Sequence, residues 1–178
     1  MREVEIKAWA DDFDRLKSLF DSLAGDGGEV DKQDFYYRRP GEEKQAFRIR
    51  KNNGVLEFTV KRNNKNEKGE ENNYEYEFFS SIDQIDKAKD FFLVLGYEHY
   101  FDKIKKGYEW HYKGVHVELL DVKSVGVMLE MEALIPFDAD EEEVRKHTDI
   151  LYSILDEAGI SRERIERRSY RSMILKGV

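Results

Sequence analysis

The run Glu3-Val4-Glu5-Ile6-Lys7, near the start of the chain, guides the interpretation of everything after it. In a β-strand, successive side chains point to opposite faces, so the two glutamates and the lysine share one face. The two carboxylates then lie about 7 Å apart along the strand, at roughly 3.4 Å per residue. Carboxylates at this spacing can converge on a hard divalent cation, and a lysine beside them can bind a phosphate oxygen. The alternative is an ordinary strand with one solvated face.

The composition excludes several classes of protein. The 178 residues are 40% hydrophobic and 38% charged, with a net charge of −8. This acidic chain is not expected to bind nucleic acid or a membrane, because both require a basic excess. Without cysteine it has no disulfide, thiolate nucleophile or cysteine-ligated zinc. Because we find no long apolar stretch and no signal peptide, we expect a cytoplasmic protein. We expect it to be either a monomer or a homodimer.

The periodicity along the chain predicts an α+β protein. Two-residue alternation or short apolar runs predict strands over 1–8, 29–39, 47–51, 55–62, 74–79, 97–106, 108–113, 115–122 and 127–135. Helical spacing and capping signals predict helices over 13–23, 81–95, 138–158 and 169–176. We expect Gly107 and Gly114 at joints between strands, and a polar loop over 62–73. Because no linker or internal repeat divides the chain, we expect one domain over residues 1–178.

Charged residues alternate with apolar ones in most of these strands, with acids grouped on some strands and bases on others. The acids are Glu3, Glu5, Glu57, Glu75, Glu77, Asp121, Glu130 and Glu132. The bases are Lys7, Arg48, Arg50, Lys61, Lys103 and Lys105. A sheet of about eight strands tends to curl and close. We therefore expect an antiparallel sheet or β-barrel of eight or nine strands. If it closes with its charged faces inward, it encloses a tunnel with a polar, charged interior and helices packed outside.

An interior with eight acids and six bases predicts the kind of ligand. Buried charges must be paired or bound to ions. Divalent cations among the acids and a polyanion among the bases would meet that requirement. Metal ions neutralise and orient phosphate groups, and arginine binds their oxygens through its planar fork. A triphosphate together with Mg²⁺ or Mn²⁺ fits this description.

The same residues, in the same order, resemble the CYTH superfamily, the triphosphate tunnel metalloenzymes. Glu3 to Lys7 is similar to the E-x-E-x-K signature of that family. The other matching segments are Gln33-Asp34 with Tyr36-Tyr37, Phe47 to Arg50, Phe58 to Lys61, Tyr74 to Glu77, Lys103 to Lys105 with Tyr108, and Asp121 to Glu132. Ser169-Tyr170 resembles the tail of class IV adenylyl cyclases. One departure is Lys105, which replaces the usual arginine and its planar fork.

The resemblance implies a metal-dependent enzyme that acts on a triphosphate inside an eight-stranded tunnel. It assigns the divalent metals to Glu3, Glu5, Glu130 and Glu132, with Asp121 nearby. It assigns the triphosphate to Lys7, Arg48, Arg50, Lys61, Lys103 and Lys105. The residues expected to carry catalysis are Glu3, Glu5, Lys7, Glu130 and Glu132, and the supporting tunnel carboxylates are Glu57, Glu75 and Glu77.

Two reactions fit one such site. In an adenylyl cyclase, the first hypothesis, the ribose 3′-hydroxyl of ATP attacks the α-phosphorus and pyrophosphate leaves. In a triphosphatase, water attacks the terminal phosphorus of tripolyphosphate, thiamine triphosphate or a nucleoside triphosphate. A module that binds nucleotide or polyphosphate without turnover, and a scaffold whose charged face is merely solvated, remain alternatives. The four histidines have no ligand-like spacing, and we expect ordinary packing or surface roles for them.

Overall fold

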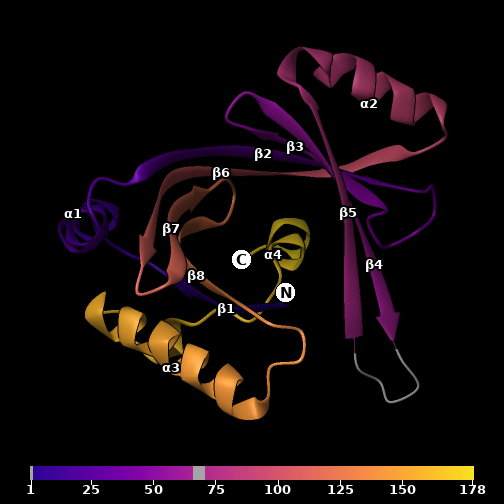
Figure 1. The fold of residues 1–178 in the computed structure, drawn as a ribbon. Helices are drawn as coiled ribbons and strands as arrows, with labels where there is room; N and C mark the ends of the chain where they lie inside the picture. The colour runs from indigo at the N-terminus through magenta and orange to yellow at the C-terminus, as the bar shows by residue number, and fades with distance from the viewer. Residues whose placement is uncertain (1, 66–70) are drawn as a thin grey trace. The chain divides into compact units, whose positions relative to one another are not determined.

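The computed structural model describes residues 2–65 and 71–178, with only the backbone described for residues 2, 61–65 and 71–75. Its eight strands and four α-helices confirm the predicted α+β class (Figure 1). The strands are β1 (Arg2–Trp9), β2 (Gly28–Arg38), β3 (Phe47–Asn52), β4 (Val55–Lys65), β5 (Glu71–Ser81), β6 (Glu98–Tyr112), β7 (Val115–Val122) and β8 (Gly126–Ile135). The helices are α1 (Phe13–Ala24), α2 (Ile85–Val94), α3 (Glu141–Glu157) and α4 (Tyr170–Lys176), with short 3₁₀ turns η1 (Ile82–Gln84) and η2 (Arg162–Arg164).

The strands form one antiparallel sheet in the order β1-β8-β7-β6-β2-β3-β4-β5, which confirms the predicted eight-stranded sheet. In the described residues, no β1–β5 pairing closes this sheet into a barrel. The residue contacts gather into two compact units. The first unit comprises Met1–Val30 and Lys105–Val178, and the second comprises Asp31–Ile104. Each unit contains its own set of charged side chains.

In the first unit, alternation gives the sheet one mainly apolar face and one face that carries most of the charged side chains, although Leu120, Val122 and Met128 are buried on the charged face. The pairings of β1 with β8, β8 with β7, and β7 with β6 run without a bulge, so each face keeps its identity from strand to strand. The apolar face carries Ile6, Ala8, Val117, Leu119, Leu129 and Met131. Helices α1 and α3 cover it with Leu16, Phe20, Leu151, Ile154 and Leu155, all at most 1% exposed. Figure 1 shows α3 lying across β1 and β8.

Both covering helices begin at side-chain caps. Asp12 accepts a hydrogen bond from the backbone N–H of Arg15 at 3.0 Å, at the start of α1. Asp140 accepts one from the N–H of Glu143 at 2.9 Å, at the start of α3. Such bonds satisfy amide groups that have no partner inside the helix. No helix in the described part of the chain combines the length and apolarity needed to span a bilayer.

The second unit has a separate aromatic core. Phe35, Tyr37, Phe47, Ile49, Leu56 and Phe58 point to one face of β2, β3 and β4. Helix α2 packs against them through Ile85, Ala88 and Phe92. Tyr37 stacks on Phe47 with 5.0 Å between ring centroids, and the ring centroid of Phe92 lies 4.2 Å from that of Phe47. Asp34, Arg48, Arg50 and Glu57 therefore occupy the opposite face.

Two predicted boundaries differ from the structure. The predicted strands 97–106 and 108–113 are one strand, β6, and Gly107 lies inside it, opposite Leu120. A Cβ atom at Gly107 would lie 1.9 Å from the backbone oxygen of Leu119, so glycine marks a close approach of two strands and not a joint. The predicted loop over 62–73 is shorter, because β4 extends to Lys65 and β5 begins at Glu71. Residues 66–70 lie outside the described residues.

A buried carboxylate ties three strands of the second unit together. Asp34 on β2 is 1% exposed. Arg50 of β3 donates to both of its carboxylate oxygens, from Nε to Oδ1 at 2.6 Å and from Nη2 to Oδ2 at 3.0 Å. The Nζ of Lys103 on β6 lies 3.0 Å from the same Oδ2. Burial alone would raise the pKa of Asp34, but Lys103 and Arg50 outweigh that effect and hold it far below its usual value. The Tyr36 hydroxyl, 3.1 Å away, donates to the same carboxylate.

We expect Gly107→Ala to destabilise the protein by roughly 3 kcal/mol, the upper part of the range for overpacking, because the new methyl group meets backbone atoms that cannot rotate away. Urea unfolding followed by circular dichroism measures this loss. Gly28→Ala is the matched control, since the nearest atom to its Cβ would be Cγ of the flexible Glu109 side chain at 3.4 Å, and the nearest backbone atom would lie at 3.9 Å, an ordinary van der Waals contact. Equal stability of the two variants would contradict the close approach.

We expect Asp34→Asn to cost about 3–5 kcal/mol at neutral pH, because it leaves Arg50 and Lys103 without their carboxylate. The native pKa of Asp34 is depressed, so its stabilisation is complete above the unfolded pKa of about 3.9 and is lost as the pH falls below it. Thermal unfolding of both proteins between pH 3 and pH 7 tests this. The advantage of the unsubstituted protein should shrink below about pH 4, and a constant difference would show that Asp34 is not the group responsible.

Candidate functional site

The charged face of the first unit brings the predicted metal-binding carboxylates together. In the antiparallel register, Glu5 of β1 lies directly opposite Glu132 of β8, and Lys7 lies opposite Glu130. Residues paired in this way have Cβ atoms about 4.5–5.5 Å apart. Glu3 lies on the same face of β1, two residues before Glu5. Four of the five predicted metal ligands therefore share one surface of two adjacent strands.

These carboxylates repel one another. Burial, followed by the charge of Glu130, raises the pKa of Glu5, although Lys7 and Lys105 oppose the shift. Burial, followed by the charge of Glu3, raises the pKa of Glu132. Glu5 still reaches solvent on one side, so its shift reflects partial loss of hydration combined with crowding by like charges. A cation bound here would relieve this repulsion.

The tail of the chain also contributes to this face. The Nζ of Lys105 lies 2.8 Å and 2.7 Å from the two oxygens of Glu130, and the hydroxyl of Tyr170 donates to one of them. The Nζ atoms of Lys7 and Lys105 lie 4.8 Å and 4.7 Å from the centroid of the Tyr170 ring. Burial, together with Glu130, raises the pKa of Tyr170 far above its usual value, so its hydroxyl remains a donor. The Ser169-Tyr170 motif thus contacts the predicted site directly.

The second unit gathers the predicted phosphate-binding arginines. Arg48 and Arg50 of β3 lie on the face opposite the aromatic core, with side chains 15% and 16% exposed. Arg50 contacts Asp34 and lies 3.8 Å from Glu57. Arg48 donates to the hydroxyl of Thr59 at 2.9 Å and lies 3.9 Å from Glu77. Glu57 and Glu77 thus lie beside the arginines.

One donor in this group has no acceptor among the side chains that the structure describes. The Nε of Arg48 is buried and has no hydrogen-bond partner among the described residues. An unsatisfied buried donor costs free energy, about 1–3 kcal/mol for a neutral group and more for a charged one. Such a group in a native protein is a reason to look for a ligand that supplies the acceptor. An anionic oxygen would meet the requirement, because arginine binds phosphate through its planar fork.

One predicted site residue, Asp121, lies apart from these groups, and the side chains of two others are not among those described. Asp121 is exposed and pairs with Val127, on the apolar-face side of β7 that carries Val117 and Leu119. It points away from Glu130 and Glu132, because an odd number of residues separates their pairing positions along the strands. Lys61 and Glu75 pair with each other in the backbone of β4 and β5, and their side chains lie outside the described residues.

The structure adds residues that the sequence analysis did not include in the site. Asp34 and Tyr36 join the arginines, and burial, followed by Asp34, raises the pKa of Tyr36 to about 12. Their alternation with the core residues Phe35 and Tyr37 is the signal that could have placed them. In the first unit, Glu109, His116 and Glu118 extend the charged face across β7 and β6.

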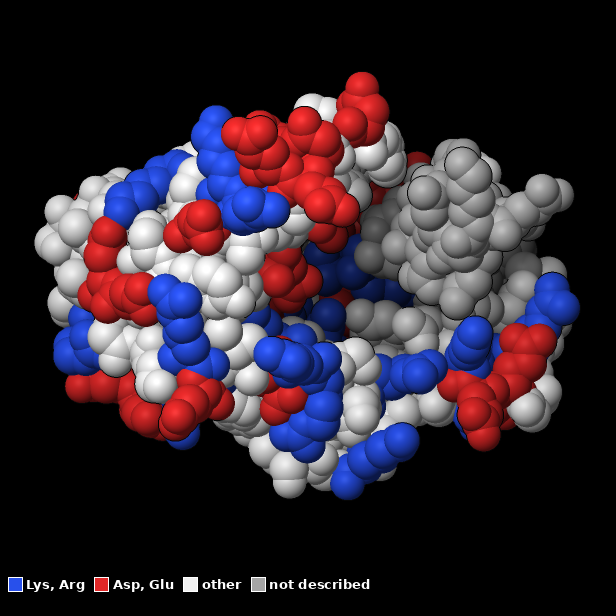
Figure 2. Space-filling view, turned by 90° about the horizontal axis from the view of Figure 1, so that it is seen from below, with Lys and Arg blue, Asp and Glu red and all other residues white. Residues whose placement is uncertain are grey.

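On the face of the molecule drawn in Figure 2, acidic side chains gather in several groups, with lysines and arginines between them.

Comparison with known proteins assigns the family. The CYTH domain model matches residues 1–170, and no curated protein matches the chain. Among solved structures, the PH1012 protein from Pyrococcus horikoshii OT3 is 25% identical, with a TM-score of 0.73 over 97% of this chain and 99% of that chain. A candidate adenylate cyclase from Vibrio parahaemolyticus is 18% identical, with a TM-score of 0.73 over 98% of each chain. A candidate adenylyl cyclase from Hippeastrum, described as having a dominant triphosphatase activity, is 11% identical, with a TM-score of 0.65 over 98% and 94%.

The last two likenesses concern the fold alone, since their identities are low. The family match is of a different kind, because it spans every strand of the sheet and the first residue of α4. The chain therefore belongs to the CYTH family, whose members act on triphosphates.

Proposed function

We propose that this protein is a divalent-metal-dependent enzyme that acts on a triphosphate, with conversion of ATP to cyclic AMP and pyrophosphate as the first candidate reaction. The observation that carries the proposal is the group Glu3, Glu5, Glu130 and Glu132 on adjacent strands, in which burial and mutual repulsion raise the pKa of Glu5 and Glu132. Carboxylates held against their own repulsion are typical of functional sites.

The residues fit a hard divalent cation. The donor set consists of carboxylate oxygens, which Mg²⁺ and Mn²⁺ prefer. When bound, such an ion would neutralise phosphate charge and orient the phosphate groups. Lys7 and Lys105 lie beside the carboxylates, where their ammonium groups would hold phosphate oxygens. In the second unit, Arg48, Arg50 and Lys103 are the proposed phosphate-binding residues, with the unsatisfied Nε of Arg48 as the available donor. Lys61 remains in this proposal on its sequence position alone.

The two reactions differ in which phosphorus is attacked. In cyclisation, the ribose 3′-hydroxyl forms a bond to the α-phosphorus, the bond to the bridging oxygen breaks, and pyrophosphate leaves. The contact of Tyr170 with Glu130 favours this reaction, because it places the cyclase-like tail motif at the carboxylates. In hydrolysis, water attacks the terminal phosphorus and orthophosphate leaves. Hydrolysis of tripolyphosphate, thiamine triphosphate or a nucleoside triphosphate is the second candidate, and the Hippeastrum protein of the same fold is described as having a triphosphatase activity. Binding without turnover is the third.

The products distinguish these candidates. The purified protein is incubated with Mg²⁺ or Mn²⁺ and, separately, with ATP and tripolyphosphate, and all products are resolved by chromatography. We expect cyclic AMP with an equal amount of pyrophosphate from ATP. Orthophosphate without cyclic AMP would replace the cyclase by the triphosphatase. Binding of either substrate without any product would leave only the binding module.

We expect Glu5→Gln to lower turnover by about 10²–10³-fold, the usual effect of removing one preorganised electrostatic partner. The metal-free variant should unfold at a temperature no lower than the parent does near neutral pH. The pKa of Glu5 is higher in the folded protein than in the unfolded chain. Ionised Glu5 therefore destabilises the folded protein once the pH exceeds the pKa of Glu5 in the unfolded chain. Calorimetry and the product assay measure the two effects. Glu29→Gln, on an exposed glutamate of the same unit, is the control. Loss of activity together with loss of stability would indicate a structural role instead.

We expect Arg48→Lys to weaken triphosphate binding by roughly 10–100-fold, because lysine keeps the charge but cannot supply the Nε donor. The substitution should therefore mainly raise KM, or the Kd for a non-hydrolysable triphosphate. Arg162→Lys is the matched control, since Arg162 on η2 makes an exposed ion pair with Asp156 of α3. Unchanged KM in Arg48→Lys would remove Arg48 from the phosphate-binding set.

A further inference from the structure

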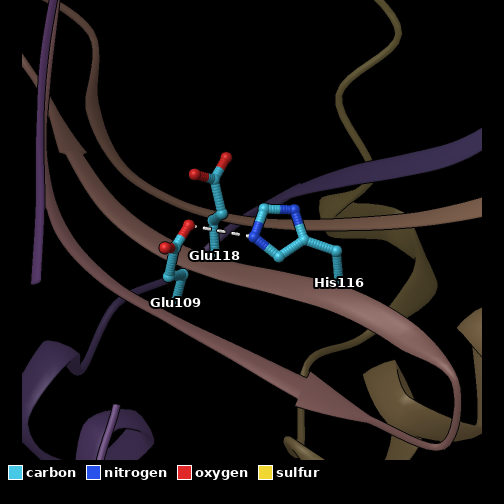
Figure 3. Close-up of side chains that lie close together, drawn as sticks. All are labelled: Glu109, His116 and Glu118. Carbon is cyan, nitrogen blue, oxygen red and sulfur yellow. Dashed lines mark hydrogen bonds and ion pairs between the residues drawn. The ribbon is translucent and has the colours of Figure 1, made fainter. Parts of the chain in front are cut away.

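A second group of metal-ligating side chains lies on β6 and β7 of the first unit. Glu109 of β6 and Glu118 of β7 are directly opposite in the register, and His116 lies two residues before Glu118 on the same face. One ligand atom from each residue lies within 4.8 Å of the others. Figure 3 shows the Glu109 carboxylate directed at the His116 ring, with the Glu118 side chain beside them. The Nε2 atom of His116 lies 3.0 Å from an oxygen of Glu109.

The group combines partial burial with access. Glu118 is 8% exposed, whereas the side chains of His116 and Glu109 are 30% and 36% exposed. An ion could therefore reach the imidazole and one carboxylate from solvent and meet a second carboxylate that is largely desolvated. Desolvation strengthens the attraction between a carboxylate and a cation.

The backbone holds the three residues in fixed positions. They lie on a hairpin whose turn residues, Lys113 and Gly114, both have positive φ angles of 53° and 74°. Two adjacent residues of this kind form the tight turn that matches the twist of paired strands. The ligand spacing is therefore set by strand pairing, and only side-chain rotations remain. Ligand atoms around a tetrahedral ion are about 3.3 Å apart when each bond is about 2.0–2.1 Å, so side-chain rotations would have to bring these atoms, which lie within 4.8 Å of one another, closer together.

We propose that Glu109, His116 and Glu118 form a binding site for a divalent transition metal ion such as Zn²⁺ or Mn²⁺. The imidazole distinguishes this site from the all-carboxylate group, because imidazole nitrogen suits Zn²⁺ and other transition metals better than Mg²⁺. Three protein ligands leave at least one coordination position for water or a substrate atom.

The surroundings favour a cation. Glu130 lies opposite Glu118, and Glu132 lies opposite His116. On the far side, His111 lies opposite His116, with 5.3 Å between the ring centroids. Carboxylates outnumber ammonium groups among the described side chains of this face, which carries Glu3, Glu5, Glu109, Glu118, Glu130 and Glu132 against Lys7 and Lys105. A second cation would thus reduce the negative charge that one ion leaves.

Zn²⁺ alone is the probe. The metal-free full-length protein is titrated with Zn²⁺ in equilibrium dialysis, and Co²⁺ substitution reports the ligand field by visible absorption. We expect His116→Gln to remove one bound ion, or to weaken its binding at least about 10–100-fold, the range seen when even a supporting partner of a ligand is lost. Glu109→Gln should have the same effect, and it guards against misfolding of a single variant. His147→Gln, on a histidine of α3 paired with Glu143, is the control and should bind as the parent does.

The inference fails if both variants bind Zn²⁺ with the stoichiometry and affinity of the parent, or if the parent binds none. This outcome is separable from the proposed function. Glu5→Gln should retain the His116-dependent ion, and turnover with Mg²⁺ is measured independently. Triphosphate turnover without His116-dependent Zn²⁺ binding would overturn this inference alone. His116-dependent binding without turnover would overturn only the proposed function.

Discussion

The unbroken register of β1, β8, β7 and β6 is the constraint on which the first unit depends. A shift of one residue between any two of these strands would turn every side chain of one strand to the other face. Glu5 would then meet Met131 or Ala133 in place of Glu132, and the apolar face would lose Ile6. The apolar core under α1 and α3 thus determines which carboxylates stand side by side. Packing on one face positions the chemistry on the other.

The second unit uses the same arrangement, with arginines and a lysine paired to carboxylates on its charged face. Its aromatic core fixes the strands, and Asp34 fixes the side chains on the other face. Because Asp34 already engages Arg50 and Lys103, those cations keep their orientation before any anion arrives. Preorganised charge of this kind is what electrostatic recognition of phosphate requires. Arg48 differs, since one of its donors is left without an acceptor in the described residues.

The sequence was sufficient where local periodicity carries the information. The alternation of Glu3 to Lys7, Arg48 to Arg50 and Glu130 to Glu132 correctly predicted which residues share a face, because a strand has a fixed two-residue period. The class and the antiparallel arrangement followed from the same period, whereas periodicity alone divided β6 into two strands. Asp121 shows the limit of motif matching: it occupies a place in the family pattern, yet the register directs it to the apolar-face side.

What the sequence could not provide depends on pairing between distant segments. Glu109 and His116 are seven residues apart and become neighbours only through the hairpin. Tyr170 is 40 residues from Glu130, and nothing local predicts that its hydroxyl donates to that carboxylate. Gly107 looked like a joint because glycine has several structural uses, and only the backbone of Leu119 shows which one applies. The single-domain prediction over 1–178 remains a prediction beside the two compact units.

The partners of Glu130 have a consequence for the order of events. Lys105 occupies both of its oxygens, so the carboxylate already has a positively charged companion. A metal ion that takes Glu130 as a ligand must exchange places with that ammonium group. The displaced ammonium group of Lys105 would then have lost its ion pair with Glu130, and a polyphosphate could replace that carboxylate as its anionic partner. Cation and polyanion would in this way bind with positive cooperativity, each lowering the free energy of binding the other by the same amount.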